Sequence, residues 1–232
     1  MPGGPDCPPM NTAVIVAAGR GTRMGPGIDK LFLEVAGWPV VAHTWRRFDA
    51  HPLIDHICLV IRPGLEAEFE EIGRRLAVGK PHTLVPGGQE RQDSVWNGLC
   101  AVPPGTELVA IQDGARPCTS ADTITRCLKA SEASGAAVAA QRAVDTIKES
   151  DDSRRVARHL DRSRLWTVQT PQCFRLPVIR GALGEARARG AVVTDDTAAC
   201  GWVGAPVELV ECPDPNPKVT VPADLRLVAL WL

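Results

Sequence analysis

The sequence predicts an α/β protein built on a doubly wound, mostly parallel sheet with helices on both faces. Two observations carry this prediction. Continuous apolar runs rich in β-branched residues recur along the chain, as expected for strands that are covered on both faces. Between these runs lie segments whose apolar residues repeat with the period of a helix. This alternation is the pattern of βαβ units, which form parallel sheets.

Four apolar runs are predicted to form strands. The first covers residues 12–18 and is interrupted by Gly19. The other three cover residues 56–61, 108–112 and 136–140. All four have the length that is typical of buried strands and not of helices.

The clearest helix is predicted after Thr119-Ser120-Ala121-Asp122, which has the pattern of a capping box, and it should end at Gly135. Ile124, Cys127 and Leu128 form its apolar face. Further helices are expected at residues 40–48, 66–76, 93–101, 177–189 and 223–232.

The pattern weakens between Asp145 and Arg164, where the chain is charged and rich in turn residues. Short β-compatible pieces flank its most polar part, residues 148–155. Such a segment cannot bury itself in a core. It is therefore expected to be either a solvated hairpin or an arm that packs on another subunit.

Composition limits the function classes. The chain has 232 residues, 44% hydrophobic and 23% charged, which is typical of an ordinary folded domain, and we expect one domain over residues 11–232. The formal net charge is −1, so no global field draws the protein to nucleic acid or anionic lipid, and any anion site must be local. No apolar stretch reaches the roughly 18 residues that span a bilayer.

The first ten residues and the cysteines indicate a cytoplasmic protein. Residues 1–10 have neither a basic region nor an apolar region of a signal peptide, so we expect a disordered tail. The eight cysteines include no CxxC pair and no zinc-like spacing with histidine. Reduced, buried thiols are therefore expected.

The first predicted strand leads into a glycine-rich connection, Ala17-Ala18-Gly19-Arg20-Gly21-Thr22-Arg23-Met24-Gly25. Glycines after a buried strand let backbone N–H groups approach an anion, and doubly wound sheets bind ligands at the carboxyl ends of their strands. A phosphate cradle and a simple tight turn are equally compatible with this loop taken alone. It is neither a dinucleotide fingerprint nor a P-loop.

Lysine is rare here, with five residues against 21 arginines, so its positions are informative. Lys30 stands at the junction between a turn-rich stretch and an apolar strand, seven residues after Arg23. The two cations could enclose a polyphosphate, although a pair of solvated charges is the default interpretation. Near the other end of the chain, Lys218 follows Asn216-Pro217.

Two further segments offer polar groups beside predicted strands or helices. Gly88, Arg91 and Ser94 precede or begin a helix, where N–H groups suit a base or a phosphate, although Asp93 or Ser94 could be a plain N-cap. Asp113 follows a buried strand, and a buried carboxylate needs a cation there. Mg²⁺ with nucleotide phosphates is one solution, and a structural ion pair with Arg116 is the other.

In this order and spacing, the segments resemble the 2-C-methyl-D-erythritol 4-phosphate cytidylyltransferase family of the non-mevalonate isoprenoid pathway. One such motif is weak evidence, whereas eight in register are specific. The resemblance covers the chain from about Asn11 onward. Its motifs are the Ala17–Met24 loop with Lys30, Gly88-x-x-Arg91-x-x-Ser94-Val95, Asp113-x-Ala115-Arg116-Pro117, Asp145-Thr146, Asp161-Arg162, Thr170-Pro171-Gln172, Thr194-Asp195 and Lys218-Val219-Thr220.

The resemblance implies a Rossmann-like nucleotidyltransferase fold whose protruding β-arm, about residues 144–166, is exchanged in a homodimer. It implies a reaction in which CTP and 2-C-methyl-D-erythritol 4-phosphate give 4-diphosphocytidyl-2-C-methyl-D-erythritol and pyrophosphate. The implied catalytic cations are Arg23, Lys30 and Lys218. The implied CTP contacts are Ala17, Ala18, Gly19, Gly21, Gly88, Arg91, Ser94 and Asp113, with Asp113 also binding Mg²⁺. The implied acceptor contacts are Arg116, Asp145, Thr146, Arg162, Thr170 and Thr194, of which Thr146 and Arg162 come from the partner.

Three departures from the family pattern stand out. Pro217 removes a backbone donor before Lys218, Asp29 is expected to neutralise part of the Lys30 charge, and Gly114 is expected to loosen the turn after Asp113. Two alternatives remain at this point. A cytidylyltransferase for another polyol phosphate, such as ribitol 5-phosphate, would share the nucleotide half, and a nucleotide-binding regulatory module would bind without turnover.

Overall fold

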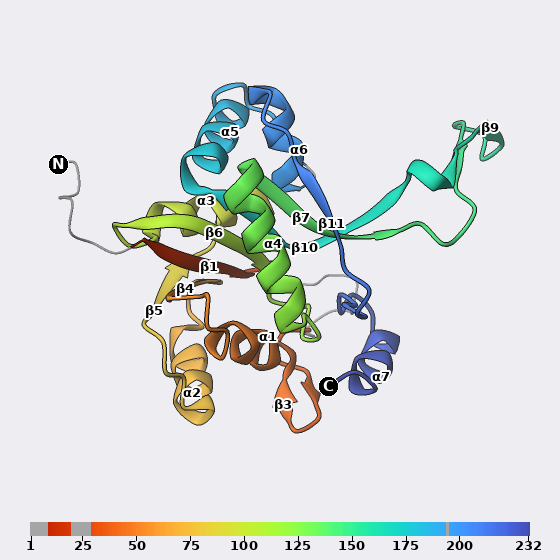
Figure 1. Cartoon of the computed structure of the whole chain (residues 1–232). Coiled ribbons are helices and arrows are strands. Elements are labelled where there is room, and N and C mark those ends of the chain that lie inside the picture. The colour runs from red at the N-terminus through yellow and green to blue at the C-terminus, as the bar shows by residue number, and fades with distance from the viewer. Residues whose placement is uncertain (1–8, 20–28, 194) are drawn as a thin grey trace.

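The computed structural model describes residues 9–19, 29–193 and 195–232. A seven-stranded sheet in the order β11-β7-β10-β6-β1-β4-β5 forms its centre (Figure 1). These strands are β1 (Met10–Ala17), β4 (His56–Ile61), β5 (His82–Pro86), β6 (Thr106–Asp113), β7 (Ala136–Arg142), β10 (Trp166–Arg175) and β11 (Glu208–Glu211). All neighbouring strands are parallel except β10, which runs antiparallel to both β6 and β7.

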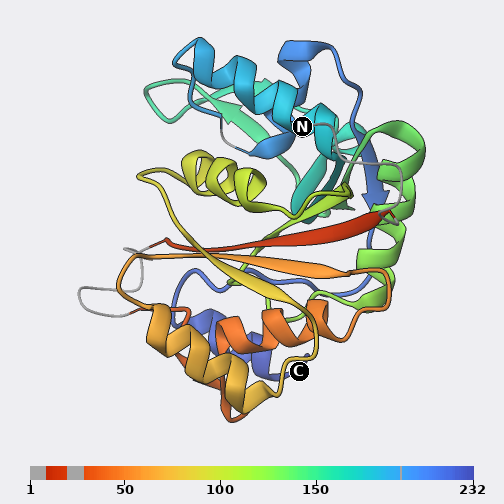
Figure 2. The same cartoon turned by 90° about the vertical axis from the view of Figure 1, so that its left-hand side faces the viewer.

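Helices cover both faces of the sheet, as Figure 2 shows with the sheet nearly edge-on. Residues of β1 alternate between two cores, so that Ala13 and Ile15 join one and Val14 joins the other. One core receives α1 (Val40–Asp49), α2 (Glu66–Leu76), α4 (Ala121–Ser134) and α7 (Ala223–Ala229), and the other receives α3 (Arg91–Ala101), α5 (Leu176–Ala188) and α6 (Asp196–Cys200). The predicted doubly wound, mostly parallel architecture is confirmed.

The predicted helices are present, with shifts at their ends. The boundaries of α2 agree with the prediction, whereas α7 ends at Ala229, three residues before the predicted end. The capping box was assigned to the wrong helix. Helix α4 begins with Ser120 as its N-cap, whose side chain accepts from the Thr123 N–H. The reciprocal box belongs to α3 instead, where Glu90 is the N-cap and its N–H donates to the Asp93 carboxylate.

Three strands of the central sheet and one short helix were not predicted from the sequence. The apolar strand expected directly after Lys30 is instead a turn at residues 30–32, followed by two strands of two residues each. Strand β5 is short and mostly exposed, so it lacks a continuous apolar run. Strand β10 contains polar residues and Pro171, and its pairing with β7 shifts register between Val168 and Gln172. Strand β11 has only four residues, and α6 has only five. Elements this short carry too few residues for a period to be recognised.

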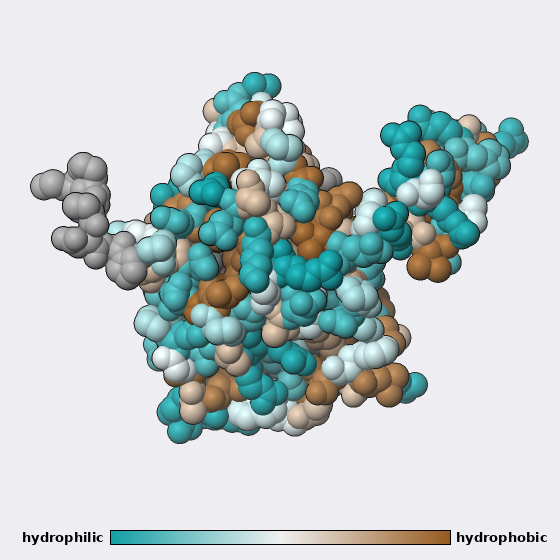
Figure 3. All heavy atoms as spheres, viewed as in Figure 1, coloured by the Kyte–Doolittle hydropathy of each residue, from teal (hydrophilic) through white to brown (hydrophobic). Residues whose placement is uncertain are grey.

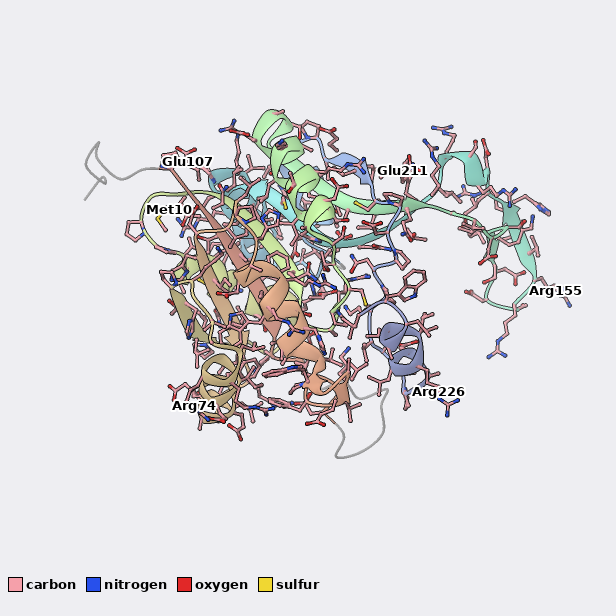
Figure 4. The ribbon with its side chains drawn as sticks, turned by 60° about the horizontal axis from the view of Figure 1, so that its bottom comes forward. Met10, Arg74, Glu107, Arg155, Glu211 and Arg226 are labelled. Carbon is pink, nitrogen blue, oxygen red and sulfur yellow. The ribbon has the colours of Figure 1, made fainter. Side chains whose placement is uncertain are left out.

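A β-arm leaves the body between β7 and β10 (Figure 1). It consists of β8 (Lys148–Ser150), β9 (Val156–His159) and the 3₁₀ turn η2 (Arg162–Arg164), and β8 and β9 pair only with each other. Figure 4 places Arg155 at its far end, well away from the body. Figure 3 shows a mostly hydrophilic arm surface with a hydrophobic area. Val144 and Val156 are exposed side chains of this segment. The arm has no core of its own in one chain.

Smaller elements complete the fold. Strands β2 (Glu34–Val35) and β3 (Trp38–Pro39) form a short hairpin before α1, and the 3₁₀ turn η3 (Gly201–Val203) follows α6. Over the described parts of the chain, no helix has both the length and the apolar character needed to cross a membrane. The parallel strands β1, β4, β5 and β6 end at the same edge of the sheet, and that edge positions the candidate site.

Candidate active site

A cavity of about 770 Å³ lies at the carboxyl ends of β1, β4, β5 and β6. This is where open α/β sheets bind their ligands. Residues from positions 16 to 218 contribute to it, so the fold joins the two ends of the chain around one space. Its lining includes Ala18, Gly19, Lys30, Gly88, Arg91, Ser94, Asp113 and Lys218 from the predicted set, together with Arg62 and Pro63.

Asp113 is the charged centre of this cavity. It is the last residue of β6 and is 8% exposed, and its backbone N–H donates to the Thr170 hydroxyl at 3.1 Å. Its carboxylate receives Lys218 Nζ at 2.7 Å and Arg91 Nε at 3.3 Å, and Arg116 Nε lies 3.6 Å away. Burial alone would raise its pKa, but the charges of Arg91 and Lys218 hold the pKa of Asp113 at about 2. The carboxylate is therefore ionised at neutral pH.

Arg91 joins Asp113 to a second buried carboxylate that was not predicted as a site residue. Its guanidinium binds Asp196 with two hydrogen bonds of 3.0 and 2.9 Å, and Asp196 is fully buried. Burial raises the pKa of the Asp196 carboxyl, although the positive charge of Arg91 acts to lower it. The sequence shows only an acidic pair, Asp195-Asp196, and Asp195 is the N-cap of α6. Only the fold reveals which of the two meets Arg91.

The two lysines singled out in the sequence meet at one side of the cavity. Lys30 Nζ donates to the Val219 carbonyl at 2.9 Å, directly next to Lys218 in the chain. Lys30 and Lys218 both line the cavity. Cationic groups separated by almost the whole sequence are thus brought to a single wall.

The glycines after β5 are required by close packing. A Cβ at Gly87 would lie 2.3 Å from the Ala18 Cβ, so only glycine lets this loop approach the end of β1. The Gly88 N–H donates to the Ser94 hydroxyl at 3.1 Å, which in turn donates to the Glu90 carbonyl. The Gly88 N–H is therefore bonded within this segment, and Ser94 lies inside α3, whose N-cap is Glu90.

Two departures noted in the sequence have a different meaning in the structure. Gly114 tightens its turn, since its N–H donates to the Val16 carbonyl at 2.9 Å and an added Cβ would lie 3.1 Å from that same oxygen. Asp29 forms an ion pair with Arg62, and its carboxylate also accepts from the Leu31 N–H. The Asp29 charge is therefore balanced by Arg62.

Asn216 holds the segment that carries Lys218, although sequence reasoning assigned it no role. This buried side chain donates to the Thr170 carbonyl at 2.8 Å and accepts from the Thr119 hydroxyl. Its backbone carbonyl accepts from Arg116 at 2.6 Å. Arg116 Nε is buried with no hydrogen-bond partner among the described residues, and burial lowers the pKa of this guanidinium although it remains charged.

A second, open depression of about 460 Å³ lies beyond Lys218. Arg116 and Lys218 form its polar side, and Val168, Leu227 and Trp231 contribute apolar surface. Lys218 therefore stands between this depression and the main cavity. Thr170 is buried at 3% exposure, and its hydroxyl is engaged by the Asp113 N–H.

The remaining predicted residues fall into two groups. Asp145, Thr146 and Arg162 belong to the arm and are not brought to the cavity of their own chain, and Arg162 donates to the Val144 carbonyl at 2.7 Å. Gly21, Arg23 and Thr194 lie outside the described residues. Ala17, at the end of β1, is buried at 2% exposure just before the cavity-lining Ala18.

One carboxylate in the cavity is suited to a divalent cation. Asp113 is ionised, lines the cavity and could supply one oxygen ligand, and Mg²⁺ needs only one or two carboxylates from protein where phosphates and water supply the rest. No cluster of three acidic, histidine or cysteine ligands occurs in the part of the chain that the structure describes. The residues therefore fit a metal shared with phosphates and not an all-protein metal site.

Comparisons with known proteins show which family this chain resembles. The sequence profile of the 2-C-methyl-D-erythritol 4-phosphate cytidylyltransferase family matches residues 11–232. Proteins of that name from Pelotomaculum thermopropionicum and Geobacillus kaustophilus are 42% and 41% identical to this chain, over 93% and 92% of it and 91% and 92% of their own lengths. A solved structure of 4-diphosphocytidyl-2C-methyl-D-erythritol synthase from Anaerococcus prevotii has a TM-score of 0.85 at 28% identity, covering 96% of this chain and 98% of its own.

Proposed function

The chain belongs to the 2-C-methyl-D-erythritol 4-phosphate cytidylyltransferase family, and from this premise we propose that the cavity at the sheet edge binds CTP and the depression beyond Lys218 binds the acceptor. The protein is a CTP-dependent nucleotidyltransferase that converts 2-C-methyl-D-erythritol 4-phosphate to 4-diphosphocytidyl-2-C-methyl-D-erythritol, with release of pyrophosphate. This activity is a step of non-mevalonate isoprenoid precursor synthesis.

The reaction needs charge compensation more than proton transfer. An oxygen of the acceptor phosphate attacks the α-phosphorus of CTP, a new P–O bond forms, and the bond to the pyrophosphate oxygen breaks. A phosphate monoester is largely dianionic at pH 7 because its second pKa is near 6, so it needs no general base. The barrier comes from bringing two anions together and from charge growth on the transferring group, so positioned cations supply most of the acceleration.

On the nucleotide side, Gly88 and Ser94 are proposed to face the base and ribose, with Ala18 and Gly19 beside the phosphates. Their support is their common position in the lining of the cavity. Gly21 and Arg23, outside the described residues, are proposed to complete the phosphate loop. Arg91 lies between Asp113 and Asp196, so its charge is held at a defined position in the wall.

The catalytic cations are proposed to be Arg23, Lys30 and Lys218. Lys218 stands between the two hollows, so its ammonium group can contact the phosphates of both reactants. That ammonium group donates to Asp113, and we propose that a substrate phosphate takes the place of this partner during the reaction. Lys30 lies on the same wall and shares the Val219 segment.

Arg116, Thr170 and Thr194 are proposed to contact the acceptor from one subunit, and Asp145, Thr146 and Arg162 from the arm of a partner in a homodimer. The support is geometric: the arm residues lie far from the cavity of their own chain, and the arm exposes Val144 and Val156 without a core of its own. Arg116 lines the depression, and its buried Nε lies 3.6 Å from the Asp113 carboxylate, so its charge is held between the two hollows.

Mg²⁺ is proposed as the cofactor, with Asp113 as its protein ligand. When bound, such an ion would neutralise phosphate charge and favour the departure of pyrophosphate. Asp113 would keep one carboxylate oxygen for Arg91, so its orientation would be retained.

We further propose a cytoplasmic location. The seven described cysteines are all free, which supports a reducing compartment.

The observation that carries the proposal is the convergence of Lys30, Arg91 and Lys218 with Asp113 in one cavity. The test is pyrophosphate release measured with four nucleoside triphosphates, each with 2-C-methyl-D-erythritol 4-phosphate or ribitol 5-phosphate, with and without EDTA. We expect release with CTP and the methylerythritol acceptor and its loss with EDTA. Release with ribitol 5-phosphate alone, or CTP binding without any release, would contradict the proposed acceptor or the proposed turnover.

A further inference from the structure

Arg62 lines the main cavity but has no role in the reaction outlined above. It follows the last residue of β4, at the same sheet edge that presents Asp113. Its guanidinium forms an ion pair with Asp29, and the two side chains are 27% and 21% exposed. Both groups are therefore partly shielded from water, and Arg62 lies at the cavity wall.

Asp29 organises the short turn that carries Lys30. Its carboxylate accepts from the Leu31 N–H at 3.1 Å, and its backbone carbonyl accepts from the Phe32 N–H at 3.1 Å. Leu31 is buried in the core, which holds the turn against the sheet. Lys30 is the second residue of this turn. The direction in which its side chain leaves the backbone therefore depends on the contacts that hold Asp29.

The turn is attached to the rest of the protein at two points. Arg62 binds the Asp29 carboxylate, and Lys30 Nζ donates to the Val219 carbonyl. The first attachment reaches strand β4, and the second reaches the segment of Lys218. Lys30 is thus placed by contacts with two elements that are distant in sequence.

The charges also explain why Asp29 needs a partner. A carboxylate next to a cavity for a triphosphate repels the ligand and attracts the neighbouring lysine, and both effects weaken Lys30 as a phosphate-binding group. Pairing with Arg62 neutralises this carboxylate while keeping its hydrogen bond to the turn. Asp29 then supports the Lys30 turn without opposing its charge.

We propose that Arg62 is a positioning residue for the reaction, acting on Lys30 through Asp29. This inference rests on the proposed function of Lys30. Arg62 has two effects: it holds the turn in place, and it removes the unfavourable charge of Asp29 from the phosphate region. A residue with this role need not touch the substrate, which separates it from Arg23, Lys30 and Lys218.

The test is a double-mutant cycle with Arg62→Gln, Asp29→Asn and the double variant, measured as kcat and KM for CTP by pyrophosphate release. Asparagine keeps the oxygen that accepts from Leu31, so Asp29→Asn removes charge and retains the turn. We expect Arg62→Gln alone to lower kcat/KM by about tenfold, because the unpaired carboxylate then opposes Lys30. The double variant is expected to regain activity to within about threefold of Asp29→Asn.

Two outcomes of this experiment would contradict the proposed role of Arg62. If the double variant is as impaired as Arg62→Gln, the arginine contacts the substrate directly, and the proposed route through Asp29 is wrong. If Arg62→Gln matches the wild type in kcat/KM, the residue has no role in the reaction and the proposal also fails. Thermal unfolding of each variant identifies any loss of activity that comes from unfolding.

A matched control is available on the surface. Arg74 forms an exposed pair with Glu71 on α2, and Figure 4 shows Arg74 at the outer side of the molecule. Arg74→Gln removes the same type of ion pair away from the cavity and should leave kcat/KM unchanged.

The wild-type assay distinguishes failure of the proposed function from failure of the proposed role of Arg62. If the wild type releases no pyrophosphate, the proposed function fails, whereas an active wild type without coupling between Asp29 and Arg62 rejects only this inference.

Discussion

The ammonium group of Lys218 donates a hydrogen bond of 2.7 Å to the carboxylate of Asp113, across 105 positions in the sequence. In this arrangement the proposed metal ligand and a proposed catalytic cation neutralise each other. Binding of a polyanion with Mg²⁺ would give each group a new partner of opposite charge. The pair therefore keeps two charged groups in place at little electrostatic cost until substrate arrives.

Replacement of either cavity lysine by alanine should affect the chemical step. We expect Lys30→Ala and Lys218→Ala each to lower kcat by about 10²-fold, because each removes a preorganised positive charge from the transferring phosphates. Steady-state pyrophosphate release is the measurement. Lys129→Ala, on the exposed side of α4, is the control and should keep wild-type kcat. Wild-type turnover in a folded Lys30 or Lys218 variant would reject the assignment.

Protonation of Asp113 should reduce the stability of the metal-free protein in acid. Its folded-state pKa of about 2 lies below its ordinary value of 3.8, so its stabilising contribution is complete above the unfolded pKa and is lost as pH falls toward 2. The full contribution is about 2 kcal/mol, of which about 1 kcal/mol should disappear between pH 5 and pH 3.

The measurement is urea unfolding of the wild type and Asp113→Asn at several pH values between 5 and 3. Other acidic groups titrate in both proteins, so the difference between their unfolding free energies isolates position 113. This difference should shrink as the pH is lowered. A constant difference over the whole range would show that the carboxylate is not stabilised by its cationic neighbours.

Loss of the Asp196 charge should destabilise the fold. Asp196→Asn leaves the Arg91 guanidinium without its two-bond partner in a buried position, and breaking a buried pair in this way costs about 3 kcal/mol. Urea unfolding at pH 7 measures the effect. Asp122→Asn, which breaks an exposed pair with Arg126, should change stability by less than about 0.5 kcal/mol. Equal effects of the two substitutions would contradict the importance of the buried pair.

Arg162→Ala tests the contribution of the arm. If the arm of one subunit completes the acceptor site of another, the KM for the acceptor rises while the affinity for CTP is unchanged. Kinetics with varied acceptor and calorimetric titration with CTP separate these quantities. Arg158→Ala, which removes an exposed pair with Glu149 on the same arm, serves as control. A loss of CTP affinity in Arg162→Ala would count against the arm as an acceptor-binding element.

The sequence alone determined the features that depend on local patterns. Strand β4 and helix α2 could be predicted because a continuous apolar run and a helical period are visible within one short window. Asp113 could be recognised as a site residue because a carboxylate at the end of a buried strand needs a charged partner. The family motifs also identified Lys30 and Lys218 as functional candidates.

The tertiary structure decided which partner each of these groups meets. Three of these pairings join chain segments that are far apart in sequence. Lys218 makes a shorter contact with Asp113 than Arg116 does, Asp196 holds Arg91, and Arg62 balances the charge of Asp29. The hydrophobic period of a segment indicates only which of its residues face a core, and this is a local property. Ion pairs depend on the relative placement of whole elements, and that placement is set by packing of the two cores across the sheet.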